Sequence, residues 1–187
     1  MNFFEVEFKY RADEISLTDF HAFCKAKNPK KYIEASGFDH FYSNPKETES
    51  FCRLRVGADM LQLTCKQKTT EKNNFTRAED NINLKKGTSK AQVESFLSKV
   101  GYTYNTSIFK SCFIYKFESY TYVYYVCYDV DMKELGRFVE IEMCEECGWS
   151  SEQAALNELV ILEKLSKDLG ITPQARVKRS LYEMFKK

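Results

Sequence analysis

The sequence predicts an α+β protein made mainly of strands that each carry an ionic face and an apolar face. In residues 5–10, charged and apolar side chains alternate with period two, as they do in a strand whose side chains point alternately to two sides. Three other stretches space apolar residues as helices do. The same ionic alternation returns in four further segments: 53–55, 66–68, 77–79 and 140–142.

The chain reads as one domain, 1–187. Its 187 residues and 43% hydrophobic content suit a single core, and no repeat, low-complexity tract or long linker divides it. The charged stretch 68–74 is interpreted as a hairpin loop. Strands are expected at about residues 2–10, 38–43, 51–56, 60–68, 75–84, 108–117, 121–130 and 137–144.

Two helices are expected in the first half of the chain. The first runs over about 17–27, with Ser16 as its N-cap and Asp19 three residues later. The second follows Ser89 and stops at Gly101. Their apolar stripes are interpreted as core packing, and they contain Leu17, Phe20 and Cys24 in the first helix and Val93, Phe96, Leu97 and Val100 in the second.

The carboxyl-terminal part predicts a third helix from Ser150 or Ser151 to Gly170. A last segment, 173–187, mixes basic and apolar residues and is expected to form a short helix that covers one end. The stripe of the third helix contains Leu156, Leu159, Leu162 and Leu165.

Charge and cysteine usage limit the function classes. Lys and Arg total 28 against 27 for Asp and Glu, so net charge does not indicate a nucleic acid or an acidic membrane as partner. No apolar run of membrane-spanning length or signal segment is seen, so a cytoplasmic, soluble protein is expected. Seven cysteines indicate reduced thiols. The pair Cys144 and Cys147 lacks the second pair that a zinc site needs.

The ionic faces cannot fill a dry core, because burying each charge costs on the order of 20 kcal/mol before pairing. They either face bulk water on an open sheet or line a water-filled barrel covered outside by apolar side chains and helices. The cations on these faces are Lys9, Arg53, Arg55, Lys66, Lys68, Arg77 and Lys110. The acidic residues are Glu5, Glu7, Glu79, Glu140 and Glu142, together with Asp129 or Asp131.

A lumen with both kinds of charge suits a polyphosphate bound with metal. Lysine and arginine donate charge-assisted hydrogen bonds to phosphate oxygens, and carboxylates hold hard divalent cations. The alternative is a polar sheet whose strands are joined by cross-strand salt bridges.

The ordered set of motifs resembles the CYTH domain, the triphosphate tunnel metalloenzyme family, over nearly the whole chain. The resemblance is closest to the class IV adenylyl cyclase branch, and it rests partly on Asp39, Phe41 and Tyr42. It implies an antiparallel eight-stranded β tunnel with a charged lumen, covered outside by helices. The motifs are Glu5-x-Glu7-x-Lys9, Arg53-x-Arg55, Lys66-x-Lys68, Arg77-x-Glu79, Leu135-Gly136-x-Phe138-x-Glu140-Ile141-Glu142 and the closing segment 179–182.

Three positions depart from the family pattern. Asn81 stands where many members have a second glutamate, and Cys112 stands where an arginine usually follows Lys110. The spacing from Asp129 to Gly136 is one residue longer than usual, so Asp131 competes with Asp129 for a metal role.

The resemblance implies a role for each matching residue. Mg or Mn would be held by Glu5, Glu7, Glu140, Glu142 and Asp129 or Asp131. Phosphates would be bound by Lys9, Arg53, Arg55, Lys66, Lys68, Arg77 and Lys110. Glu79 and Lys9 are the candidate catalytic residues.

Three functions stay open at this point. The first is cyclisation of ATP to cyclic AMP and pyrophosphate. The second is hydrolysis of tripolyphosphate, thiamine triphosphate or a nucleotide or RNA 5′-triphosphate. The third is binding of a triphosphate or RNA without turnover. A small triphosphate is the expected partner, no membrane is expected, and a homodimer is left open.

Overall fold

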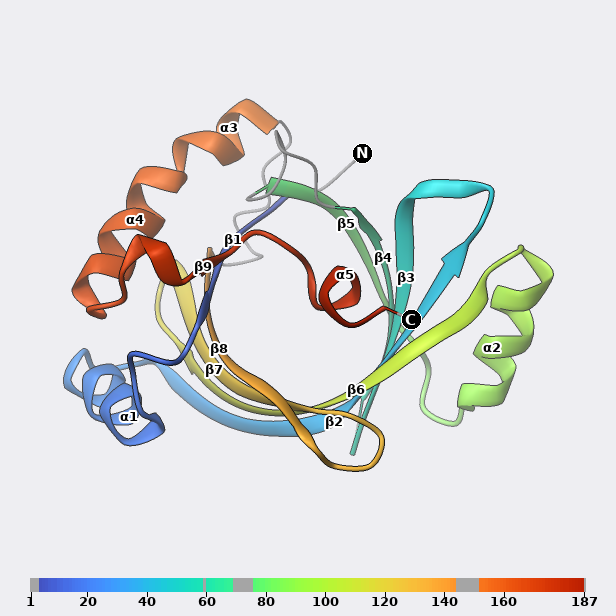
Figure 1. The fold of residues 1–187 in the computed structure, drawn as a ribbon, viewed down its shortest axis with the longest axis horizontal. Coiled ribbons are helices and arrows are strands. Elements are labelled where there is room, and N and C mark those ends of the chain that lie inside the picture. The colour runs from blue at the N-terminus through green and yellow to red at the C-terminus, as the bar shows by residue number, and fades with distance from the viewer. Residues whose placement is uncertain (1–3, 59, 69–75, 144–151, 187) are drawn as a thin grey trace.

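The chain forms a closed antiparallel barrel of eight strands (Figure 1). The computed structural model describes residues 4–58, 60–68, 76–143 and 152–186. The strands are β1 Phe4–Arg11, β2 Lys31–Asn44, β3 Glu47–Gly57, β4 Leu61–Gln67, β5 Thr76–Asn83, β6 Thr103–Lys116, β7 Tyr120–Tyr128, β8 Glu134–Met143 and a short β9 Arg176–Val177. The helices are α1 Leu17–Ala26, α2 Lys90–Lys99, α3 Glu152–Asn157, α4 Leu159–Asp168 and α5 Leu181–Phe185.

The strand order β5-β4-β3-β2-β6-β7-β8-β1 is closed by pairing of β1 with β5. Residues 4–6 of β1 pair with β5, while residues 9–10 along the same edge pair with β9. The predicted fold class is therefore confirmed, and every expected strand is present. Strands β2 and β6 are longer than expected, because they pair with each other from Lys31 and Lys116 to Ser43 and Thr103.

Apolar side chains on the outer face of the barrel are covered by helices. Phe8 and Tyr10 of β1 are buried with Phe20 of α1 and Leu162 of α4 in one cluster. The Tyr10 hydroxyl donates a hydrogen bond of 2.7 Å to Ser166 Oγ, which ties α4 to the barrel. On another part of the wall, α2 covers β3.

Part of the interior is also apolar, which corrects the expectation of a wholly water-filled lumen. Phe41, Phe51 and Val123 point inward and are buried with Leu181 and Tyr182. The last two residues belong to α5, which lies inside the ring of strands in Figure 1. The terminal helix thus packs into the barrel and restricts the ionic part of the lumen.

The helices differ from expectation in two places. The expected third helix is divided at Glu158, where i to i−3 hydrogen bonds from Glu158 to Ala155 and from Ile161 to Glu158 replace the α-helical pattern. Its expected start and the pair Cys144 and Cys147 lie outside the described residues.

In α2 the capping box of Ser89 is present. Phe96 and Val100, however, are 58% and 47% exposed, because only Val93 and Leu97 face the barrel. None of the helices in the described ranges is long and apolar enough to cross a membrane.

Candidate active site in the barrel lumen

A cavity of about 220 Å³ lies inside the barrel and receives side chains from all eight barrel strands and α5. Its position follows from strand alternation, because every second residue of each strand points inward. The basic residues of the lining are Lys9, Arg53, Arg55, Lys66, Arg77, Lys110 and Lys116. The acidic residues are Glu5, Glu7, Asp39, Glu79, Glu140 and Glu142.

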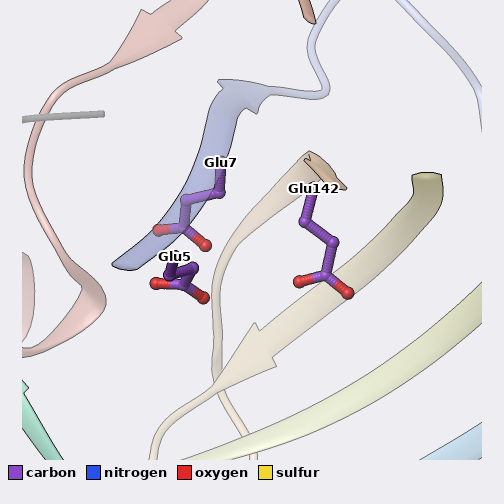
Figure 2. A group of neighbouring side chains, drawn as sticks. All are labelled: Glu5, Glu7 and Glu142. Atoms are coloured by element: carbon purple, nitrogen blue, oxygen red, sulfur yellow. The ribbon is translucent and has the colours of Figure 1, made fainter. Parts of the chain in front are cut away.

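Three of these carboxylates form a cluster, which we call the glutamate cluster: Glu5, Glu7 and Glu142. Glu5 and Glu7 share a face of β1, and Glu142 lies opposite Glu7 in the β1–β8 register. One oxygen from each lies within 4.8 Å of the others. Figure 2 shows how the three side chains lie on their strands. Burial and the charges of Glu7 and Glu79 raise the pKa of Glu5 well above its ordinary value. Such crowded carboxylates suit a divalent cation.

Two buried cations lie against the glutamate cluster. Lys66 forms ion pairs with Glu5 and, at 2.6 Å, with Glu79. Arg77 pairs with Glu7. Burial opposes the charge of Glu7, but Lys66 and Arg77 lower the pKa of that carboxyl below its ordinary value. Glu7 is therefore ionised near neutral pH.

Lys9 and Glu140 form a second charged group on the neighbouring positions of β1 and β8. Their side chains are 3.3 Å apart, and the Tyr125 hydroxyl donates a hydrogen bond of 2.7 Å to Glu140. Lys110 Nζ lies 3.7 Å from the centre of the Tyr125 ring. Burial opposes ionisation of Glu140, yet the charges of Lys110 and Lys9 lower its pKa.

On β3, the guanidinium group of Arg53 makes fewer hydrogen bonds than it has donors. Its Nη2 donates to Thr64 at 3.1 Å and lies 3.7 Å from Glu79. Its Nε is buried and has no hydrogen-bond partner among the described residues. A buried donor of this kind is costly unless an acceptor is supplied, and an anionic ligand would supply one.

Three of the residues expected in the site do not line the cavity. Lys68 follows the last residue of β4, and its backbone N–H donates to Glu49. Asp129 and Asp131 lie in the turn between β7 and β8. Asp129 Oδ1 accepts hydrogen bonds from the backbone N–H groups of Asp131 and Lys133. The hairpin uses Asp129 for its own turn, so the structure does not bring it to the glutamate cluster.

The remaining expected residues do line the cavity, and several others join them. Asp39 lies on the inward face of β2 with Phe41, and this alternation was a usable signal in the sequence. Tyr182 enters from α5 and stacks on Phe51 with ring centres 4.7 Å apart. Nothing in the local sequence places the last helix inside the barrel. Lumen-facing residues outside the expected set include Gln62, Asn81, Ile114, Lys116 and Ser180.

Known proteins share this fold. No family model matches the chain, and no curated protein matches its sequence. Among solved structures, a conserved hypothetical protein from Pyrococcus furiosus is 22% identical, with 97% of this chain and 99% of that chain covered and a TM-score of 0.74. A presumed adenylate cyclase from Vibrio parahaemolyticus is 18% identical, with 98% of both chains covered and a TM-score of 0.71.

An RNA triphosphatase domain of a mimivirus mRNA capping enzyme is also similar. It is 10% identical, with 90% of each chain covered and a TM-score of 0.55. At these identities the likeness shows the fold. The similarity extends along almost the whole chain.

Proposed function

We propose that this protein binds a triphosphate with Mg²⁺ or Mn²⁺ in its barrel and catalyses a metal-dependent reaction at one of the phosphorus atoms. The observation that carries the proposal is the contact between the glutamate cluster and the buried cations Lys66 and Arg77. Carboxylates for a hard cation and donors for phosphate oxygens thus lie side by side.

The charge balance of the lumen explains why metal and triphosphate would bind together. Seven basic and six acidic side chains line the cavity, and most of the basic ones contact a carboxylate. A polyanion alone would have to break these ion pairs. A divalent cation on the glutamate cluster would offset the carboxylates and leave Lys66 and Arg77 for phosphate.

The donor set fits a magnesium or manganese ion. Glu5, Glu7 and Glu142 offer only carboxylate oxygens, the ligand type that these hard cations prefer. When bound, such an ion would polarise phosphoryl oxygens and neutralise developing charge. The resemblance adds Glu140 to this set, but Glu140 already pairs with Lys9 at 3.3 Å.

The protein's own groups would orient the phosphates and the attacking hydroxyl group. Lys66, Arg77 and the spare Nε of Arg53 would donate to phosphate oxygens. Glu79 is held by Lys66 and by a 2.9 Å hydrogen bond from Asn81. Burial opposes its charge, but Lys66 and Arg53 lower the pKa of Glu79, so it is ionised near neutral pH and can accept a hydrogen bond from the attacking hydroxyl group.

A nucleoside triphosphate is the substrate that the comparisons favour. Phe41, Phe51 and Tyr182 also line the cavity, but these rings are buried against one another and do not select a nucleobase. The reaction would be attack of the ribose 3′-oxygen on the α-phosphorus of ATP, with loss of pyrophosphate; Glu79 would orient the hydroxyl group, and its proton would pass to solvent. The similarity to a presumed adenylate cyclase supports this choice.

Hydrolysis is the second candidate, and the similarity to an RNA triphosphatase domain favours it. Product analysis separates the two. The protein is incubated with ATP, thiamine triphosphate or tripolyphosphate, each with Mg²⁺ and with Mn²⁺. Cyclic AMP and pyrophosphate from ATP are the expected products. Release of inorganic phosphate would identify a triphosphatase. Metal-dependent binding without product would identify a binding protein.

A further inference from the structure

Two cysteines face each other on the outer surface of the barrel. Cys52 of β3 and Cys65 of β4 are direct partners in the antiparallel register, which runs without a bulge from residue 50 to residue 56. They lie on the face opposite to Arg53 and Lys66, which line the cavity. None of the proposed metal or phosphate ligands lies on this outer face.

The hydrogen bonds at the two ends of this ladder fix the kind of pair that the cysteines form. Gly57 N–H donates to Met60 O at 2.8 Å, and Lys68 N–H donates to Glu49 O at 2.7 Å. Hydrogen-bonded pairs alternate with non-hydrogen-bonded pairs along antiparallel strands. Counting from either end makes Cys52 and Cys65 a non-hydrogen-bonded pair.

This geometry is compatible with a disulfide. The Cα atoms of a non-hydrogen-bonded pair are about 4.5 Å apart, and disulfides span Cα distances of about 4.4 to 6.8 Å. The two thiols are close enough that each shifts the pKa of the other. A bond between the sulfurs therefore needs no shift of strand register.

The two thiols differ in environment. Cys65 is exposed, whereas Cys52 is buried beneath Val93 and Leu97 of α2. The hydrogen bond from Cys52 lowers the pKa of Cys65 to about 7, against the effects of burial and of the carboxylate of Asp80. The hydrogen bond to Cys65, together with burial, raises the pKa of Cys52. The accessible and more acidic thiol of Cys65 thus lies beside the protected thiol of Cys52 on the neighbouring strand.

We propose that Cys52 and Cys65 form a redox-active dithiol that low-molecular-weight disulfides such as glutathione disulfide convert to a cross-strand disulfide. The Cys65 thiolate attacks one sulfur of glutathione disulfide, forms a mixed disulfide and releases one glutathione thiolate. Cys52 gives its proton to solvent and attacks the Cys65 sulfur, which releases the second glutathione. The two cysteines are oxidised, and one glutathione disulfide is reduced to two glutathione molecules.

The linkage would join the two strands that carry Arg53 and Lys66 into the lumen. Each of these cations directly follows one of the cysteines in sequence. The modification site is independent of the proposed function, since its formation requires neither metal nor triphosphate.

The test is incubation of the full chain with glutathione disulfide, followed by alkylation of free thiols, trypsin digestion and mass spectrometry. Cleavage after Lys46, Arg53, Arg55 and Lys66 gives peptides 47–53 and 56–66, each with a single cysteine. The expected result is a disulfide-linked pair of these two peptides that dithiothreitol separates. Full alkylation of both cysteines after the incubation would overturn the proposal, as would linkage of Cys65 to another cysteine.

Two variants and a control test the order of the steps. Cys52→Ala is expected to keep one glutathione on Cys65, because no second thiol is present to displace it. Cys65→Ser should leave Cys52 unmodified. Cys112 is the comparison thiol without a cysteine partner, since its cross-strand neighbours are Ala35 and Tyr125, and its rate is also measured in urea, where both thiols are accessible. Cys65 is expected to react at least about tenfold faster than Cys112, and equal rates would contradict its role as the attacking thiol.

Discussion

Arg55 donates two hydrogen bonds to Asp39, from Nε at 2.7 Å and from Nη2 at 2.9 Å. This is the bidentate geometry that joins an arginine to a carboxylate most strongly. Asp39 is only 2% exposed, and burial opposes its charge, but Arg55 lowers the pKa of Asp39 below its ordinary value of 3.8. The pair fixes one lumen cation in place before any ligand binds.

The first prediction is that this pair makes the protein sensitive to acid. Because the pKa of Asp39 is lower in the folded state than in the unfolded state, ionised Asp39 stabilises the folded protein above about pH 4. This stabilisation is lost as the pH falls toward the pKa of the folded state. Asp39→Asn should cost about 3 kcal/mol near neutral pH. It should also reduce the acid slope of unfolding free energy by up to about 1.4 kcal/mol per pH unit.

The difference in acid slope is measured by urea unfolding of the wild type and of Asp39→Asn between about pH 2 and pH 7, which covers the range in which carboxyl groups titrate. Glu34→Gln is the control, because Glu34 is an exposed carboxylate on the same strand. An unchanged acid slope in Asp39→Asn would show that the pair does not govern acid stability.

The second prediction concerns the glutamate cluster. Glu142→Gln should weaken Mn²⁺ binding by about tenfold or more, since it removes one of three carboxylates. Glu7 is less suitable for this test, because its removal also leaves the buried Arg77 without that partner. Glu134→Gln serves as the control on the same strand, as Glu134 pairs with Arg137 on the surface. Equal Mn²⁺ affinity in the Glu142→Gln and control proteins would exclude Glu142 as a ligand.

A third prediction separates two neighbouring lysines. Lys66→Gln should reduce triphosphate affinity by about tenfold, because a charge-assisted bond contributes roughly 1.5 to 3 kcal/mol. Lys68→Gln should reduce it much less, since Lys68 does not line the cavity. Titration with Mg²⁺-tripolyphosphate measures both. Equal losses in the two variants would contradict the placement of Lys68 outside the site and support the motif, in which both lysines bind phosphate.

The fourth prediction uses Cys112, which lines the cavity beside Lys110. Cys112→Arg should strengthen triphosphate binding by about tenfold or more, because it adds a guanidinium facing the phosphates. Binding of tripolyphosphate is measured at two salt concentrations, and the gain should shrink at the higher one. Weaker or unchanged binding by a folded variant would mean that position 112 does not reach the ligand.

Much of the fold was predictable because period-two alternation reports which side of a strand is buried. The inward positions of Glu5, Lys9 and Glu140 follow from it directly. Alternation does not reveal where a chain end packs, so the entry of Tyr182 into the barrel could not be predicted. The division near Glu158 was hidden for a similar reason, since the leucine spacing continues across it.

The residue types of the site could be predicted from the sequence, but the contacts that individual residues make could be predicted less well. Side-chain alternation identifies the face of Lys68, but not that β4 ends one residue before it. Likewise, the sequence near Asp129 does not show that its carboxylate is used within the hairpin turn. The Asp39–Arg55 pair depends on the register between β2 and β3, which becomes visible only when the barrel is assembled.

The most direct test of the central claim is a calorimetric comparison of tripolyphosphate binding with and without magnesium. In the metal-free protein the lumen cations are engaged by carboxylates, so tripolyphosphate in a chelating buffer should bind weakly. The preformed Mg²⁺ complex, with excess Mg²⁺, should bind about tenfold more tightly or better. Equal affinity in the two conditions would contradict a shared site for metal and triphosphate in the barrel.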